Sequence, residues 1–261
     1  MRALALASLY VAAIWVPAHA GVTEPRRPSP LKGGIEFQGE QVRAMQADAF
    51  GNPGLLWVDR GAALWKSPRG ARNASCAACH GSDGSSMKGV AARYPAYSAS
   101  LGGVVDLEQR INACVGANQQ APALAWESQD LLALSAFVAS RSAGLPIAPD
   151  ASRESDSAFE RGRTIYLERQ GQMNLACTHC HDANWGRTLL AERISQGHPA
   201  DWPAYRLEWQ SPGSLERRLR ACYLGVRAEM PPYGSPDLVA LEVYLARRAQ
   251  GLVSSAPGVR R

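Results

Sequence analysis

The chain has 261 residues, and its 28 Lys and Arg against 23 Asp and Glu give a formal net charge of +5. This mildly basic balance comes without a run of Lys or Arg. It therefore argues against nucleic-acid binding and suits an anionic substrate or an acidic partner protein. The length fits one or two domains.

Residues 1–20, MRALALASLYVAAIWVPAHA, predict a secretory signal peptide. Arg2 supplies the positive charge, an apolar run follows, and Ala18-His19-Ala20 is a small-residue cleavage site before Gly21. The alternative is a membrane anchor, but a span needs roughly 20 apolar residues and this run is shorter. Because no later segment is long and apolar enough to span, we expect a soluble mature protein, exported to a bacterial periplasm.

Residues 21–53 carry prolines and glycines, and we expect an N-terminal extension in the form of an extended arm, with a helix near 38–49. After it the chain repeats. Gly61 and Trp65 precede one CxxCH motif, and Gly162 and Tyr166 precede another, 101 residues later at each position. Segment 130–144 matches 237–251 at an offset of 107. Duplication of one domain explains this pattern, and predicts domains at 54–147 and 158–252 joined by a polar linker at about 145–157.

Both ends of each repeat are predicted to be helical. Segments 130–143 and 237–250 place apolar residues at helical spacing: Leu131, Leu134, Phe137 and Val138 in the first, and Leu238, Leu241, Tyr244 and Leu245 in the second. Gly144 and Gly251 are expected to cap the two helices. Strand signals are sparse in between, so the predicted fold class is mainly α.

CxxCH is the attachment signature of c-type haem. Two thiols three positions apart can bond one porphyrin from one side of a helical turn, and the next His can ligate the iron. The pairs are Cys76 with Cys79 and Cys177 with Cys180, followed by His80 and His181. A zinc site or a redox CxxC is the alternative, but zinc prefers four protein ligands and each motif offers three.

The residues that flank the two motifs fit a class I cytochrome c fold. In such a fold a small residue on an N-terminal helix meets an aromatic ring on a C-terminal helix. We expect Gly61 to meet Phe137, and Gly162 to meet Tyr244. The chain is thus predicted to contain two class I cytochrome c-like domains in tandem.

The two remaining cysteines end similar passages, LEQRINAC at 107–114 and LERRLRAC at 215–222. Cys114 follows His80 by 34 residues and Cys222 follows His181 by 41, in the region where a distal iron ligand is expected. Since thiolate is a haem ligand, we predict Cys114 and Cys222 as distal ligands.

Other residues compete for that role. In the first repeat the only Met is Met87, which is too close to His80 to reach the opposite face of a haem. In the second repeat Met230 and His198 are rivals, although neither has a counterpart in the first. A disulfide between Cys114 and Cys222 is the further alternative, which an oxidising compartment would permit.

Paired CxxCH motifs with paired downstream cysteines resemble those of the SoxA family, the cytochrome subunits of the sulfur-oxidising SoxAX complex, in its dihaem form. The resemblance covers roughly residues 50–251. It is most specific at Arg218-Leu219-Arg220-Ala221-Cys222, at Tyr233-Gly234-Ser235-Pro236 and at Leu241-Glu242-Val243-Tyr244.

The resemblance implies two covalently bound haem c groups and an L-cysteine S-thiosulfotransferase activity. Proteins of this family join thiosulfate to a cysteine of the sulfur-carrier protein SoxYZ, beside the monohaem cytochrome SoxX. Two electrons pass to haem and on to an acceptor cytochrome. By the same resemblance, Cys222 is the active-site cysteine, able to carry an extra sulfur as a persulfide, and Arg218 is the basic residue beside it.

The distribution of arginines suggests which haem is the active one. Cys222 is accompanied by a set of arginines that would bind an oxyanion such as thiosulfate: Arg217, Arg218, Arg220 and Arg227. The matching passage of the first repeat keeps only Arg110. We therefore expect catalysis at the second haem and electron transfer or a lesser role at the first. Two other functions stay open: a dihaem electron-transfer cytochrome without its own chemistry, and a thiosulfate dehydrogenase that forms tetrathionate.

Overall fold

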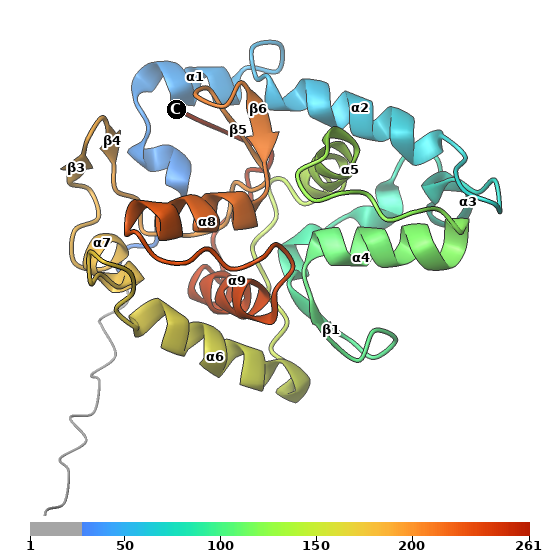
Figure 1. Cartoon of the computed structure of the whole chain (residues 1–261). Coiled ribbons are helices and arrows are strands. Elements are labelled where there is room, and N and C mark those ends of the chain that lie inside the picture. Colours follow the sequence, from blue (N-terminus) through green and yellow to red (C-terminus); the bar gives the residue numbers. More distant parts are fainter. Residues whose placement is uncertain (1–27) are drawn as a thin grey trace, which may run out of the picture.

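A computed structural model describes residues 28–261, so the predicted signal peptide lies outside the described residues. Two similar helical units make up most of the molecule, and in each unit an N-terminal helix crosses a C-terminal helix (Figure 1). The described part of the chain contains no helix long and apolar enough to cross a membrane.

The elements follow the predicted repeat. The first unit contains α2 (Gly54–Lys66), α3 (Cys76–His80), β1 (Ala96–Ser98), β2 (Gly103–Val105), α4 (Leu107–Cys114) and α5 (Gln129–Ser140). The second contains α6 (Asp156–Leu167), α7 (Cys177–His181), β3 (Thr188–Leu189), β4 (Glu192–Arg193), β5 (Ala204–Arg206), β6 (Ser211–Gly213), α8 (Leu215–Gly225) and α9 (Pro236–Arg248). Strand β7 (Gly258–Arg260) ends the chain, and α1 (Glu40–Ala47) precedes the first unit. The mainly α, tandem architecture predicted from the sequence is confirmed.

Each unit is built on a helix crossing with a glycine at its centre. A Cβ atom added to Gly61 would overlap the carbonyl oxygen of Ala133 and lie 2.7 Å from the Phe137 Cβ. One added to Gly162 would overlap the carbonyl oxygen of Ala240, 2.9 Å from the Tyr244 Cβ. The two predicted glycine–aromatic pairs are therefore confirmed, and each crossing leaves no room for a side chain.

Substitution of Gly162 by Ala is expected to lower the melting temperature of the protein. The added methyl group must push α6 away from the backbone of α9, and overpacking of this kind costs typically 1–3 kcal/mol. Gly116→Ala is the matched control, because Gly116 is also helical and an added Cβ would meet nothing within 4 Å beyond its own helical turn. Thermal unfolding monitored by circular dichroism compares the three proteins. Equal melting temperatures for wild type and Gly162→Ala would contradict the close crossing.

The apolar faces of the two C-terminal helices are buried as predicted, with Leu131 and Leu238 both 0% exposed. The predicted helix ends are wrong by a few residues. Helix α5 ends at Ser140 and α9 at Arg248, so each helix stops before its glycine. Gly144 and Gly251 have positive φ angles and lie in the turns that follow, where their N–H groups bond to distant carbonyls rather than to the helix end.

Short strands, which the sequence signals barely indicated, connect the helices at equivalent places. Ser98 pairs with Gly103 in the β1–β2 hairpin, and Arg206 pairs with Ser211 in the β5–β6 hairpin. Strand β7 adds to β5 in parallel. The two hairpins thus belong to the repeat, and each leads directly into the helix that carries Cys114 or Cys222.

The described part of the N-terminal extension, residues 28–53, contains the predicted helix but is not an extended arm. The Gln46 side chain of α1 accepts a hydrogen bond at 2.8 Å from the backbone of Val259 in β7. Phe37 packs edge-on against Trp185. The first contact satisfies a backbone donor of β7 and the second buries apolar surface, so this part of the extension packs on the second unit.

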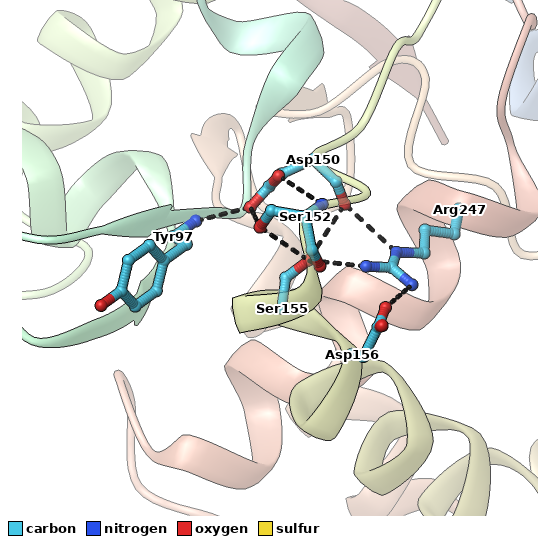
Figure 2. Close-up of polar contacts among 6 residues, drawn as sticks. All are labelled: Tyr97, Asp150, Ser152, Ser155, Asp156 and Arg247. Carbon is cyan, nitrogen blue, oxygen red and sulfur yellow. Dashed lines mark hydrogen bonds and ion pairs between the residues drawn. The ribbon is translucent and has the colours of Figure 1, made fainter.

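The segment between the two units forms hydrogen bonds with both of them (Figure 2). The Asp150 carboxylate accepts a hydrogen bond at 2.8 Å from the backbone N–H of Tyr97 in β1. Arg247 of α9 donates to the Asp150 carbonyl at 3.1 Å, to Ser155 at 2.6 Å and to Asp156 at 3.0 Å. The connection is therefore an ordered bridge between the two units.

Five acidic side chains gather where the two units meet: Asp106, Glu108, Glu127, Glu216 and Glu242. Asp106 and Glu216 are each 1% exposed and Glu242 is 6% exposed. Burial, and then mutual repulsion, raises the pKa of Asp106 to about 7 and those of Glu108 and Glu216 to about 8. The pKa of Glu242 is raised well above its usual value for the same reasons, with Asp106, Glu216 and Glu108 as the repelling groups.

These carboxyl groups make the stability of the protein depend on pH. Because their pKa values are higher in the folded chain than in the unfolded one, the folded state binds more protons at intermediate pH. Stability should therefore fall as the pH rises from about 4.5 to about 8. Glu242→Gln removes one of these charges, so we expect the variant to melt at a higher temperature than wild type at pH 8 and at a similar temperature at pH 5. Glu160→Gln is the control, since Glu160 is exposed. A wild-type melting temperature that rises between pH 5 and pH 8, with no gain from Glu242→Gln, would contradict this.

Candidate functional site

Each CxxCH motif forms a single helical turn at the same place in its unit. In the first unit, Trp65 donates its indole N–H to the carbonyl of Gly81, at 2.8 Å. In the second, Tyr166 at the matching position donates its hydroxyl to Asp182 at 3.0 Å. The aromatic residue before each motif thus fixes the end of α3 or α7, and a helical turn brings the two thiols of a motif toward one side.

In the second unit, the loop that contains Ser195 and Gly197 packs against the ring of His181. Its Nδ1 lies 2.7 Å from the carbonyl oxygen of Ser195. Gly197 has a φ of +74°, and a Cβ there would lie 3.1 Å from the His181 Cγ, so only glycine lets this loop approach the ring. Since Nδ1 is engaged, Nε2 is the nitrogen available to a metal.

Cys222 lies within hydrogen-bonding reach of His181 in the same unit. Burial opposes ionisation of the Cys222 thiol, but the charge of Arg218, a hydrogen bond from His181 and the charges of His181 and Arg206 outweigh it and lower the pKa to about 7. Burial, and then the Cys222 charge, raises the pKa values of Cys177 and Cys180. The structure therefore brings Cys177, Cys180, His181, Cys222 and Arg218 around one space.

The first unit has a similar but less complete arrangement. Burial, and then the nearby Cys114, raises the pKa of Cys76, so these two sulfur atoms are neighbours. Arg110 and Cys114 both act on the Tyr94 hydroxyl, whose pKa is raised chiefly by burial. Cys79 is exposed, and the exposed ring of His80 lies against Trp65, with 5.6 Å between ring centroids. His80 and Cys114 form no hydrogen bond with each other in the described residues.

The alternatives to Cys222 as distal ligand lie elsewhere. His198 belongs to the loop that supports the back of His181, and its Nε2 lies 3.2 Å from the Gln196 side chain. Met230 is 40% exposed. All six cysteines are free, so Cys114 and Cys222 form no disulfide with each other.

Of the four arginines expected around Cys222, only Arg218 both lies beside the thiol and has a guanidinium without a partner among the described side chains. Arg217 lies over Trp209 and pairs with Glu127 at 3.8 Å. Arg220 lies over Tyr233 and donates to the carbonyl of Pro231. Arg227 is exposed. The guanidinium of Arg218 forms no hydrogen bond or ion pair with any described side chain, and its charge acts directly on Cys222.

Sequence reasoning missed Arg206. This residue is 3% exposed, lies in β5 and is the second arginine whose charge acts on Cys222. A signal was available, because Pro-Ala-Tyr occurs at 95–97 and again at 203–205, 108 residues apart, and the next residue is Ser98 in one copy and Arg206 in the other. That comparison marks Arg206 as specific to the second unit.

Comparison with known proteins places the chain in a family. The SoxA/TsdA cytochrome c domain model matches residues 60–147. An L-cysteine S-thiosulfotransferase subunit SoxA from Pseudaminobacter salicylatoxidans is 37% identical over 226 residues, covering 86% of this chain and 79% of the relative. The chain belongs to the SoxA family. Another SoxA, from Rhodovulum sulfidophilum, is 35% identical over 244 residues, covering 94% of this chain and 84% of that relative.

The fold is also that of a SoxA-containing structure. The crystal structure of SoxXA from Paracoccus pantotrophus aligns with a TM-score of 0.85 and 30% sequence identity, covering 88% of this chain and 87% of that chain. The expected family and the expected fold are both confirmed. Membership of the SoxA family, with its cytochrome c domain, implies haem c as a cofactor of this chain.

The residues of the second unit fit a haem c in a protein of the SoxA family. The imidazole of His181 has its Nδ1 bonded to Ser195, and it lies beside the Cys222 thiol, whose pKa is lowered. Imidazole nitrogen and thiolate sulfur are both ligands that suit haem iron. The two further thiols of the motif border the same space. Buried polar atoms without a partner occur in both units, among them Gln119 Oε1 and Arg206 Nε, as expected around a polar group that the described residues do not include.

Proposed function

We propose that this chain is the dihaem cytochrome subunit of an L-cysteine S-thiosulfotransferase, which conjugates thiosulfate to a cysteine of a SoxYZ-like sulfur-carrier protein. Its relatives carry that name. The observation that carries the proposal is the grouping of Cys222 with His181, with the uncommitted guanidinium of Arg218 beside the sulfur. The structure thus supports an anion-binding, redox-active sulfur site.

The reaction is an oxidation. A sulfur–sulfur bond forms between the terminal sulfur of thiosulfate and the carrier thiolate, so that S₂O₃²⁻ and RS⁻ give RS–SSO₃⁻ and two electrons. Haem, when bound, supplies the acceptor, one electron at a time. The two electrons then leave the subunit for an acceptor cytochrome.

The residues around Cys222 have distinct tasks in this proposal. Arg218 binds the sulfonate end of thiosulfate by charge-assisted hydrogen bonds, which leaves the terminal sulfur facing Cys222. Cys222 contributes the sulfur at which conjugation occurs, as a thiolate or as a persulfide. The lowered pKa of Cys222 keeps a large share of this sulfur ionised at neutral pH. The hydrogen bond from His181 Nδ1 to Ser195 holds the imidazole in place.

The holoprotein is predicted to carry two covalent haems, one on Cys76 and Cys79 and one on Cys177 and Cys180. His80 and His181 are the proximal iron ligands in this proposal, and Cys114 and Cys222 are the distal ones. Mass spectrometry of the purified protein should give the mass of the processed chain plus two haem groups. A mass corresponding to one haem, or to none, would show that one motif or both are not attachment sites.

Three further assignments complete the proposal. The cytochrome c units are 54–147 and 158–252, behind an extension at 21–53. Residues 1–20 direct export to the periplasm. A SoxX-like monohaem cytochrome completes the enzyme as a heterodimer, as suggested by the name of the SoxXA structure that the chain resembles.

The test is a turnover assay of the holoprotein with its partner cytochrome. Reduction of an acceptor should require both thiosulfate and a carrier protein with a free cysteine, and the carrier should gain the mass of a thiosulfonate group. Thiosulfate oxidation to tetrathionate without a carrier would instead support the second candidate, a thiosulfate dehydrogenase. This candidate is kept because the matching family model spans both SoxA and TsdA. Reduction without any thiosulfate dependence would indicate a plain electron carrier.

A further inference from the structure

The Arg206 side chain is a buried cation with an unused donor. It is 3% exposed, yet its Nε–H has no hydrogen-bond partner among the described residues. Its two ion pairs, with Glu192 at 2.8 Å and Glu208 at 2.6 Å, are both made through Nη2. An unsatisfied buried donor costs free energy, and more so on a charged group. The arrangement therefore calls for an acceptor that the polypeptide does not supply.

The surroundings of Arg206 keep the guanidinium in place. The guanidinium lies over Trp209, with its carbon 4.9 Å from the ring centroid, and the guanidinium of Arg217 lies over the same ring at 4.0 Å. A Cβ on Gly213 would overlap the Trp209 ring, so glycine at this position gives the indole its room. The ion pairs and the cation–π contact together fix the guanidinium before any ligand arrives, which reduces the entropy cost of binding.

The location of Arg206 points to the kind of ligand. Its charge acts on Cys222 and on Arg218, and Arg206 lies over the same Trp209 ring as Arg217, the residue before Arg218. The two guanidinium groups are therefore near each other and near the sulfur. Two neighbouring cations repel each other, and an anion between them removes that repulsion. The equivalent residue of the first unit is Ser98, at the same register position of its hairpin, so only the second unit has this second cation.

We propose that Arg206 and Arg218 form a two-guanidinium site for an anionic oxygen beside Cys222, with the Arg206 Nε–H as one of its donors. This inference rests on the proposed function for the identity of the small anion. Two sources share the chemistry: the sulfonate of thiosulfate and a carboxylate of the haem. In the first case Arg206 is a catalytic residue that binds substrate, and in the second it is a residue that holds the cofactor.

The experiment compares Arg206→Lys with Arg217→Lys in the holoprotein bound to its partner cytochrome. Lysine keeps the positive charge but lacks the Nε–H donor that the guanidinium of arginine provides. Arg217 is the matched control, because it lies over the same Trp209 ring and its charge is not among those that act most strongly on Cys222. Three quantities are measured: the KM and kcat with thiosulfate, the dissociation constant of thiosulfate from the change that it produces in the haem spectrum, and the midpoint potential of the second haem.

If the anion is the sulfonate, Arg206→Lys should raise the KM and the dissociation constant for thiosulfate roughly ten-fold or more, with an unchanged potential. If it is the haem carboxylate, the potential of the second haem should shift and acquire a new pH dependence, with the KM within about two-fold of wild type. Either result, with Arg217→Lys like wild type, supports the site. An Arg206→Lys variant that changes none of these quantities would overturn it.

A second variant keeps the test decisive if Arg206→Lys does not accumulate. Glu192→Gln, at a side chain that is 32% exposed, removes one negative charge from Arg206 and should strengthen anion binding. We expect a thiosulfate KM two- to three-fold lower, or a raised potential of the second haem. No change in either would count against the proposal. Should the wild-type enzyme fail to turn over thiosulfate, the function would be wrong, yet the equilibrium titrations would still test Arg206.

Discussion

Cys222→Ala is expected to abolish thiosulfate conjugation while the second haem stays covalently attached. The substitution removes the sulfur at which we place the chemistry, and loss of a group that takes part in the reaction lowers turnover by roughly three decades or more. Attachment survives because Cys177 and Cys180 are unchanged. Turnover with thiosulfate and carrier, together with the mass of the denatured protein, measures both parts of this result.

Cys114→Ala is the matched control, since it alters the equivalent residue of the first unit. It should change the spectrum of the first haem and raise its potential, because an anionic thiolate stabilises ferric iron. Turnover should largely survive, since Arg218, whose guanidinium has no protein partner, lies beside Cys222 and not beside Cys114. If Cys114→Ala were as inactive as Cys222→Ala, with the second haem spectrally intact, the active site would not be at the second unit.

The architecture could be predicted because repetition and helix spacing are local properties of a sequence. The 101-residue offset around the CxxCH motifs and the apolar spacing of segments 130–143 and 237–250 are enough to place two helix crossings, and the buried Phe137 and Tyr244 confirm them. Helix ends were less predictable. Gly144 and Gly251 resemble helix caps, but their N–H groups bond to Ser254 and Ile147, which no local pattern could indicate.

The packing of the N-terminal extension could not be predicted for the same reason. Prolines and glycines in 21–53 suggested an extended arm, whereas its partners lie at the opposite end of the chain. Gln46 bonds to Val259, 213 residues away. Contacts of this separation depend on the complete fold, and strands of two or three residues, such as β7, have too few residues to show an alternating pattern.

At the site, the sequence indicated which residues carry charge but not how they are paired. Four arginines around Cys222 looked alike, and only the structure shows that Arg217 is engaged by Glu127 and Trp209 while Arg218 is free to act on the thiol. Arg206 was missed because it precedes Cys222 by 16 residues and reaches it through a hairpin. Alignment of the two Pro-Ala-Tyr passages is the comparison that would have found it.

Arg218→Ala should weaken the enzyme without abolishing it. The guanidinium of Arg218 has no protein partner to lose, so its removal should leave the folded structure intact and act on the substrate step. A charge-assisted contact with thiosulfate at a partly buried site is worth roughly 1.5–3 kcal/mol, which corresponds to about one to two decades in kcat/KM. Both a raised KM for thiosulfate and a lowered kcat are expected, because the same contact holds the anion and orients its terminal sulfur.

Two variants separate this role from a general effect of positive charge. Arg218→Lys keeps the charge and should recover part of the lost activity, since lysine binds an oxyanion as a point charge without the planar fork. Arg227→Ala removes an exposed arginine of the same region and should behave as wild type. Steady-state kinetics over a range of thiosulfate concentrations measure all three. Equal losses in Arg218→Ala and Arg227→Ala would show that the surface charge attracts the anion over a distance, and that Arg218 makes no contact of its own with thiosulfate.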